Sequence, residues 1–138
     1  MIVQDIYLED YDWSIRVYYA VHEYFISNIL IDLLDIDCDE ESFFKIKGLM
    51  ETGNDNIGFT YTNTEMRASL MLIGKTDSSD EFQDTFDHEK GHLVMHISSA
   101  LGLDPYSEDY QYLAGEVGKR MFKVAKKFLC DHCKQYIL

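Results

Sequence analysis

The chain has 138 residues, of which 46% are hydrophobic and 14% aromatic, with a single proline at position 105. That length fits one domain with its own core, spanning residues 1–138, and the composition is too apolar and too poor in proline for a disordered chain. Its 25 acidic residues outnumber its 12 basic residues, which gives a net charge of −13. Nucleic-acid binding depends on neutralising phosphates with Lys and Arg, so this balance argues against a nucleic-acid partner.

The sequence contains neither a predicted membrane segment nor a pattern of cysteines typical of disulfide-bonded proteins. No run approaches the roughly 18 to 20 apolar residues that span a bilayer, and the N-terminus lacks the basic start and apolar stretch of a signal peptide. We therefore expect a cytoplasmic protein with no membrane partner. The three cysteines are Cys38, Cys130 and Cys133, and we expect reduced thiols. A zinc site at Cys130 and Cys133 would need a second pair of ligands, which the sequence does not offer nearby.

The first part of the chain predicts a hairpin followed by two helices. Apolar residues alternate with period two over 6–8 and 13–21, which indicates two strands joined by a turn. A stripe of isoleucine and leucine over 22–36 then predicts a helix. Asp39 can cap a second helix, with two glutamates in its first turn, where the helix dipole favours negative charge.

A second pair of strands follows. Residues 52–56 predict a turn because they combine Gly with Asn and Asp. Residues 57–62 and 68–74 predict two strands around a polar connection. The order of strands, helices, strands and then helices indicates an α+β domain rather than a βαβ repeat.

Two helices should complete the chain. Ser78 and Glu81 have the spacing of a capping box, so a helix is expected over 79–101, ending at Gly102. Ser107 can cap a final helix. Its apolar stripe has the three-to-four-residue spacing of a helix face and consists of Tyr110, Leu113, Val117, Met121, Val124 and Phe128.

His88, Glu89 and His92 form the pattern H-E-x-x-H inside the helix predicted over 79–101. Histidines at i and i+4 lie one above the other on a helix, so both imidazoles can reach one Zn²⁺ ion. Glu89 points about 100° round the helix and can take a proton from a water held by the metal. Gly91 costs about 1 kcal/mol relative to Ala in a helix interior, a cost that a close backbone approach over the site would explain.

The third metal ligand is less clearly signalled. His96 continues the i+4 series, but its Cα lies about 12 Å from that of the first motif histidine, while a Zn–N bond is about 2 Å. A carboxylate on the next helix is the remaining solution, and Glu108, Asp109 and Glu116 are available. If the two helices form a tight antiparallel hairpin, Glu116 lies level with the second motif histidine.

Several segments together resemble a known group of proteins. They are 80–92, which contains the motif, 108–115, 11–13 and 58–63, so the resemblance covers most of the chain. The group comprises uncharacterised proteins of Bacteroidota and their prophages that are identified as zinc peptidases of gluzincin type. The resemblance implies a zincin-like fold in which a small antiparallel or mixed sheet packs with an active-site helix and a long C-terminal helix. It also implies Glu108 as the third zinc ligand, because an acidic residue recurs just before a Tyr-Leu pair. It implies no substrate.

Three functions fit these observations. The first is a zinc metallohydrolase acting on a peptide or protein, with Glu89 as general base and Tyr112 or His96 donating a hydrogen bond to the oxyanion. By analogy with zincins, the strand 68–74 would border the cleft and pair with an extended substrate. The alternative is a non-catalytic phage or mobile-element interaction protein on a zincin scaffold, which the small size and the acidity suit. A third is a structural metal site that includes His96.

Overall fold

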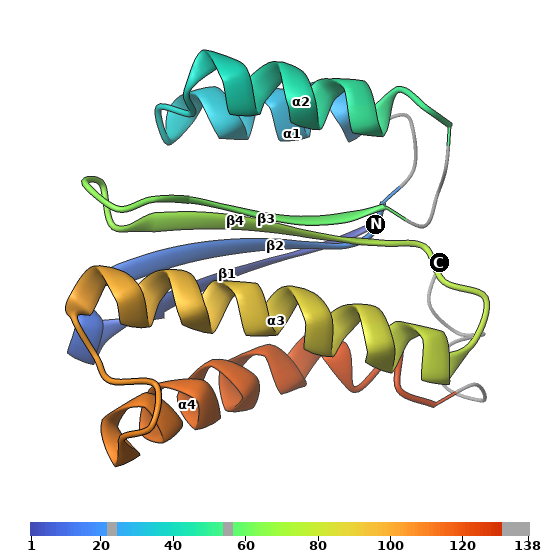
Figure 1. Ribbon diagram of the computed structural model, residues 1–138. Coiled ribbons are helices and arrows are strands. Elements are labelled where there is room, and N and C mark those ends of the chain that lie inside the picture. Colours follow the sequence, from blue (N-terminus) through green and yellow to red (C-terminus); the bar gives the residue numbers. More distant parts are fainter. Residues whose placement is uncertain (22–24, 54–56, 131–138) are drawn as a thin grey trace.

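The computed structural model describes residues 1–21, 25–53 and 57–130. A four-stranded sheet lies between two helical layers, with α1 and α2 on one face and α3 and α4 on the other (Figure 1). In chain order the elements are β1 (Ile2–Leu8), the short 3-10 helix η1 (Glu9–Tyr11), β2 (Trp13–Val21), α1 (Ile26–Asp35), α2 (Glu40–Met50), β3 (Gly58–Asn63), β4 (Ala68–Gly74), α3 (Ser79–Leu101) and α4 (Glu108–Ala125). The α+β class and the small mixed sheet are therefore confirmed.

The strand order is β1-β2-β4-β3. Two antiparallel hairpins, β1–β2 and β3–β4, are joined side by side through a parallel pairing of β2 with β4. β4 thus has a neighbour on each side, and all seven of its residues are buried. The expectation that 68–74 borders the cleft is wrong, because the parallel pairing places this strand inside the sheet and leaves β3 at the edge.

The sheet separates two apolar cores. On one face, α3 and α4 pack against side chains such as Trp13, Val17 and Met71. On the other face, α1 and α2 pack against a smaller set that includes Tyr18 and Leu72. Burial on both faces explains the continuous apolar run of β4, which is typical of a strand covered on both sides.

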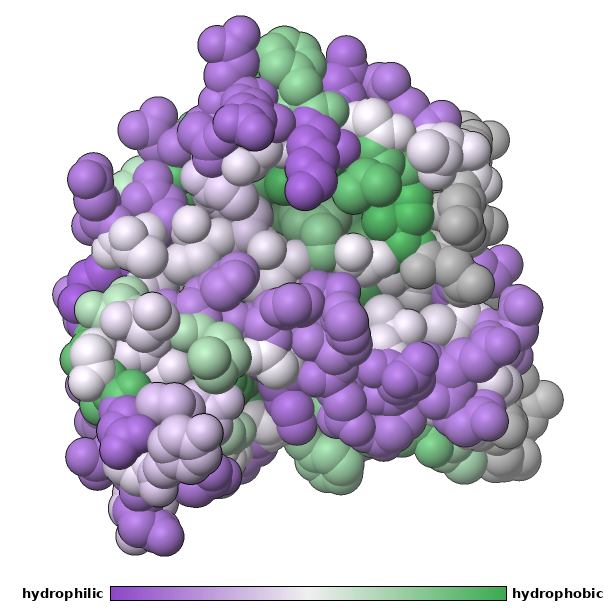
Figure 2. All heavy atoms as spheres, viewed as in Figure 1, coloured by the Kyte–Doolittle hydropathy of each residue, from purple (hydrophilic) through white to green (hydrophobic). Residues whose placement is uncertain are grey.

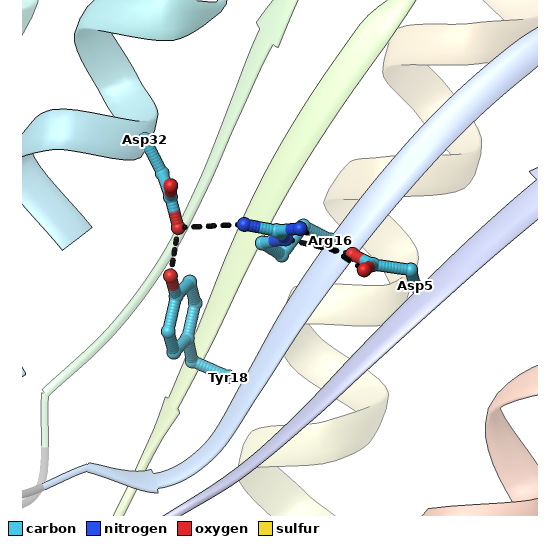
Figure 3. Close-up of polar contacts among 4 residues, drawn as sticks. All are labelled: Asp5, Arg16, Tyr18 and Asp32. Carbon is cyan, nitrogen blue, oxygen red and sulfur yellow. Dashed lines mark hydrogen bonds and ion pairs between the residues drawn. The ribbon is translucent and has the colours of Figure 1, made fainter. Parts of the chain in front are cut away.

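A polar network fastens α1 to the sheet (Figure 3). Arg16 on β2 donates to both carboxylate oxygens of Asp5 on β1, at 2.7 and 3.0 Å. Its guanidinium also donates to Asp32 on α1 at 3.2 Å, and Tyr18 donates its hydroxyl hydrogen to the same carboxylate. Arg16 is thus held between two carboxylates, and these neighbours raise the pKa of its guanidinium.

The helix ends follow the predicted caps. Asp39 accepts a hydrogen bond from the Ser42 amide at 2.9 Å, and Ser107 accepts one from the Tyr110 amide at 3.2 Å. Ser78 accepts from the Glu81 amide at 3.4 Å.

The C-cap of α3 is Gly102 in the left-handed region, with φ 69°. The first residues of the helix predicted over 22–36, the turn residues 54–56, and Cys133 lie outside the described residues. None of the described helices is long and apolar enough to cross a lipid bilayer.

Candidate metal centre

The two motif histidines converge at their outer nitrogens. His88 and His92 are both exposed on α3, and their Nε2 atoms lie 3.2 Å apart. Their rings meet edge to face, with centroids 4.8 Å apart. The i, i+4 spacing therefore brings together the two atoms that a metal would need.

This separation can be compared with zinc chemistry. Two nitrogens at 2.0–2.1 Å from one tetrahedral Zn²⁺ ion are separated by about 3.3 Å. The observed distance of 3.2 Å between the imidazole nitrogens agrees with this expected separation. The separation therefore matches two positions of a tetrahedral zinc site, and without a metal it is also that of a hydrogen bond between the two rings.

Glu89 points from α3 toward the edge strand. It is only 5% exposed, and its Oε1 accepts a hydrogen bond from Thr60 Oγ1 at 2.9 Å. The Thr60 hydroxyl also lies 3.2 Å from the backbone oxygen of Glu89. The single hydroxyl hydrogen of Thr60 is thus shared between, or alternates between, the side chain and the backbone of the predicted general base, with the shorter contact to the side chain.

Gly58 makes the close approach that we expected at Gly91. A Cβ atom at Gly58 would lie 2.9 Å from Oε2 of Glu89 and 3.2 Å from its Cγ, whereas a Cβ at Gly91 would meet nothing within 4 Å. The explanation of Gly91 by a close backbone contact is therefore wrong. Gly58 was missed because nothing in the local sequence places residue 58 opposite residue 89.

A pocket of about 400 Å³, here called the edge pocket, lies where α2, β3 and α3 meet. Both motif histidines and the general base line it, together with Lys45 from α2 and His96 from α3. Its apolar lining is contributed by Ile46, Leu49 and Phe59. Figure 2, in the same view as Figure 1, shows apolar atoms gathered in a hollow between the upper and lower helical layers. The candidate metal site thus opens onto a recess beside the free edge of the sheet.

The third ligand expected from the resemblance is not brought to the pair. Among the described residues, no three His, Cys, Asp or Glu side chains gather closely enough to hold a metal ion. α4, which begins at Glu108, packs along the flank of α3 that carries Lys90, since the Lys90 side chain approaches Gly118. Lys90 lies about 200° round the helix from His88. Most of α4 therefore lies across α3 from the imidazoles.

The alternative ligand is engaged elsewhere. Glu116 accepts a hydrogen bond from Arg120 at 2.8 Å, and Arg120 also binds Glu9 and the backbone oxygen of Tyr7. These contacts belong to the β1 side of the molecule. The carboxylate of Glu116 is therefore paired on the β1 side of the molecule and not with the imidazoles.

The structure separates the two candidate hydrogen-bond donors. Tyr112 is 67% exposed on α4 and does not line the edge pocket, whereas His96 does. Burial and the neighbouring His92 lower the pKa of His96, which favours its neutral form. Of the two candidates, His96 is therefore the one that lines the edge pocket.

Comparison of the chain with family models, curated proteins and solved structures gave no match.

Proposed function

We propose that this protein is a zinc-dependent metallohydrolase, and that its substrates are peptides or proteins. The observation that carries the proposal is the 3.2 Å separation of the two motif Nε2 atoms beside a buried carboxylate in a pocket. His88 and His92 would hold the metal. Bound zinc would polarise a carbonyl oxygen and lower the pKa of a water molecule.

The chain's own residues supply the remaining chemistry. Glu89 would take a proton from the attacking water and deliver it to the leaving amine. The hydroxyl of Thr60 holds one of its oxygens at 2.9 Å, which sets the direction of the other. Gly58 leaves room for the carboxylate because it has no side chain. β3 therefore acts as the support of the general base.

β3 also supports the substrate class. It is the last strand of the sheet, and it borders the edge pocket along Gly58 to Tyr61. An extended peptide can pair with a free sheet edge through its main chain. Such pairing would lay a scissile bond beside the imidazole pair, so the edge strand favours a peptide over a compact small molecule.

A second candidate function has one specific observation in its favour. The Glu89 carboxylate is nearly buried and already engaged by Thr60, as in a structural polar pair. If that contact is permanent, the protein would be a non-catalytic interaction protein of a phage or mobile element. Its net charge of −13 suits a basic partner surface.

Metal analysis tests the proposal directly. The purified chain, supplied with zinc at neutral pH, should hold close to one zinc per chain by elemental analysis. His88→Ala and His92→Ala should each abolish tight binding, because one imidazole alone cannot replace the pair. His96→Phe is the matched control on the same helix and should keep the wild-type stoichiometry. A wild-type protein free of zinc under these conditions rejects the proposal.

The same assay decides on the third ligand. If Glu108 is that ligand, as the resemblance implies, Glu108→Ala should weaken zinc binding by at least the 10- to 100-fold seen when supporting residues are lost. Glu116→Ala should leave it unchanged because that carboxylate pairs with Arg120. An unchanged affinity in Glu108→Ala removes Glu108 from the site.

A further inference from the structure

His96 is the end of a hydrogen-bonded row that crosses the sheet. Its Nδ1 lies 2.9 Å from Thr62 Oγ1 on β3, which lies 2.7 Å from Ser69 Oγ on β4. Trp13 on β2 donates its indole hydrogen to Ser69 Oγ at 3.0 Å. Thr62 and Ser69 are directly opposite in the β3–β4 register. Four side chains from three neighbouring strands and α3 thus form one network, here called the Trp13 network.

The direction of the network is fixed at its buried end. The indole N–H of Trp13 can only donate, so Ser69 Oγ accepts there. Ser69 is 3% exposed, and a buried hydroxyl hydrogen needs an acceptor inside the protein. Among the described contacts, that acceptor is Thr62 Oγ1. Thr62 then keeps its own hydroxyl hydrogen, which it can donate to His96 Nδ1.

A neutral imidazole that accepts at Nδ1 carries its hydrogen on Nε2. We propose that Trp13, Ser69 and Thr62 are positioning residues that hold His96 as the Nε2–H tautomer, so that it presents a hydrogen-bond donor to an oxygen atom of a bound ligand. The nitrogen left for the pocket then has no lone pair to offer a metal. His96 thereby acts beside the metal pair and not as part of it.

His96 lies where two pockets meet, so its side chain is accessible from both. It lines the edge pocket and also a second hollow of about 670 Å³, which continues past β3 along Glu65, Arg67 and Met95. A ligand lying along the strand would pass His96 between the two recesses. The role toward a ligand oxygen rests on the proposed function, whereas the tautomer rests on the hydrogen bonds alone.

Nitrogen-15 NMR of the full chain without added metal tests the tautomer. Long-range ¹H–¹⁵N correlations should show His96 protonated on Nε2 and unprotonated on Nδ1, with the resonances assigned by their loss in His96→Gln. Finding the hydrogen on Nδ1 in the wild type overturns the proposal, because the network would then run in the opposite direction.

Two threonine variants on the same strand test the positioning role. Thr62→Val removes the hydroxyl at nearly constant shape, so it should displace the Nδ1 resonance and allow both tautomers. Thr60→Val is the matched control, because its hydroxyl contacts Glu89, and it should leave the His96 resonances in place. Unchanged His96 resonances in a natively folded Thr62→Val protein reject the role. If Thr62→Val does not fold, Ser69→Ala makes the same test one step further along the network.

The zinc-loaded protein tests the donor. His96→Phe should keep one zinc per chain while lowering kcat by about 10²- to 10³-fold, as for loss of an oxyanion donor, with KM little changed. A loss of zinc in this variant makes His96 a ligand and overturns the proposal. If the wild type cleaves no peptide, the proposed function fails, and the NMR result still decides the tautomer.

Discussion

The two edges of the sheet use polar side chains in opposite ways. At the β1 edge, Arg120 from α4 donates to the backbone oxygen of Tyr7 at 3.1 Å and forms ion pairs with Glu9 and Glu116. The charged groups of these three side chains pair with one another and lie beside the outer edge of β1. An edge strand covered in this way is protected from pairing with another chain.

At the β3 edge, the side chains of the strand point their hydroxyls at α3. Thr60 holds Glu89 and Thr62 holds His96, and the edge pocket lies beside them. β3 thus orients ionisable side chains that face a pocket. At the β1 edge, by contrast, the ionisable side chains form ion pairs with one another. The comparison indicates that the polar contacts of β1 pair charges with one another, whereas those of β3 hold residues of the candidate site.

The largest effect should come from Glu89→Gln. The amide has the same shape but cannot accept a proton, so hydrolysis of any substrate found should fall by about 10²- to 10⁴-fold. Zinc content should not change, because the side chain is not a ligand. Initial rates with a peptide pool and elemental analysis measure both quantities, and Asp84→Asn, an exposed carboxylate on the same helix, is the control. Full activity in Glu89→Gln would assign this carboxylate to structure, as at the other edge.

Local signals in the sequence predicted the elements of both edges. Caps at Asp39, Ser78 and Ser107 predicted the starts of three helices, period-two alternation predicted the first two strands, and apolar runs around a polar connection predicted the other two. These patterns depend on residues close in the chain. The imidazole pair was found for the same reason, since its members are only four positions apart on one helix.

Long-range pairings were beyond such signals. The parallel β2–β4 contact puts β3 at the edge, and no short pattern specifies which strands become neighbours. The expected roles of Gly91, of Glu116 and of the strand 68–74 each depended on that arrangement or on the crossing of α3 and α4. The Trp13 network was missed because its four members are spread over residues 13 to 96.

Substitutions of two glycines, at positions 58 and 91, should have effects of intermediate size. Gly58→Ala would place a Cβ 2.9 Å from Glu89 Oε2, so the carboxylate must move. We expect about tenfold lower activity and a loss of about 1 kcal/mol in the free energy of unfolding, as for modest overpacking. Gly91→Ala meets open space and should raise that free energy by up to about 1 kcal/mol, because Ala is the better helix former. Rates and denaturant midpoints distinguish them, and equal activities would show that β3 does not position Glu89.

The smallest effect should come from the β1 edge itself. Arg120→Met keeps the apolar stem of the side chain and removes its charge, which leaves Glu9 and Glu116 without their partner. Both ion pairs are partly exposed, so the free energy of unfolding should fall only slightly. Urea denaturation measures this loss, and added salt should reduce the difference from the wild type, because salt screens exposed charges. Zinc binding should be unchanged, since these charges lie with β1 and not at the imidazole pair. A drop in zinc affinity in Arg120→Met would instead show that releasing Glu116 disturbs the metal centre, and the two edges would then act as one site.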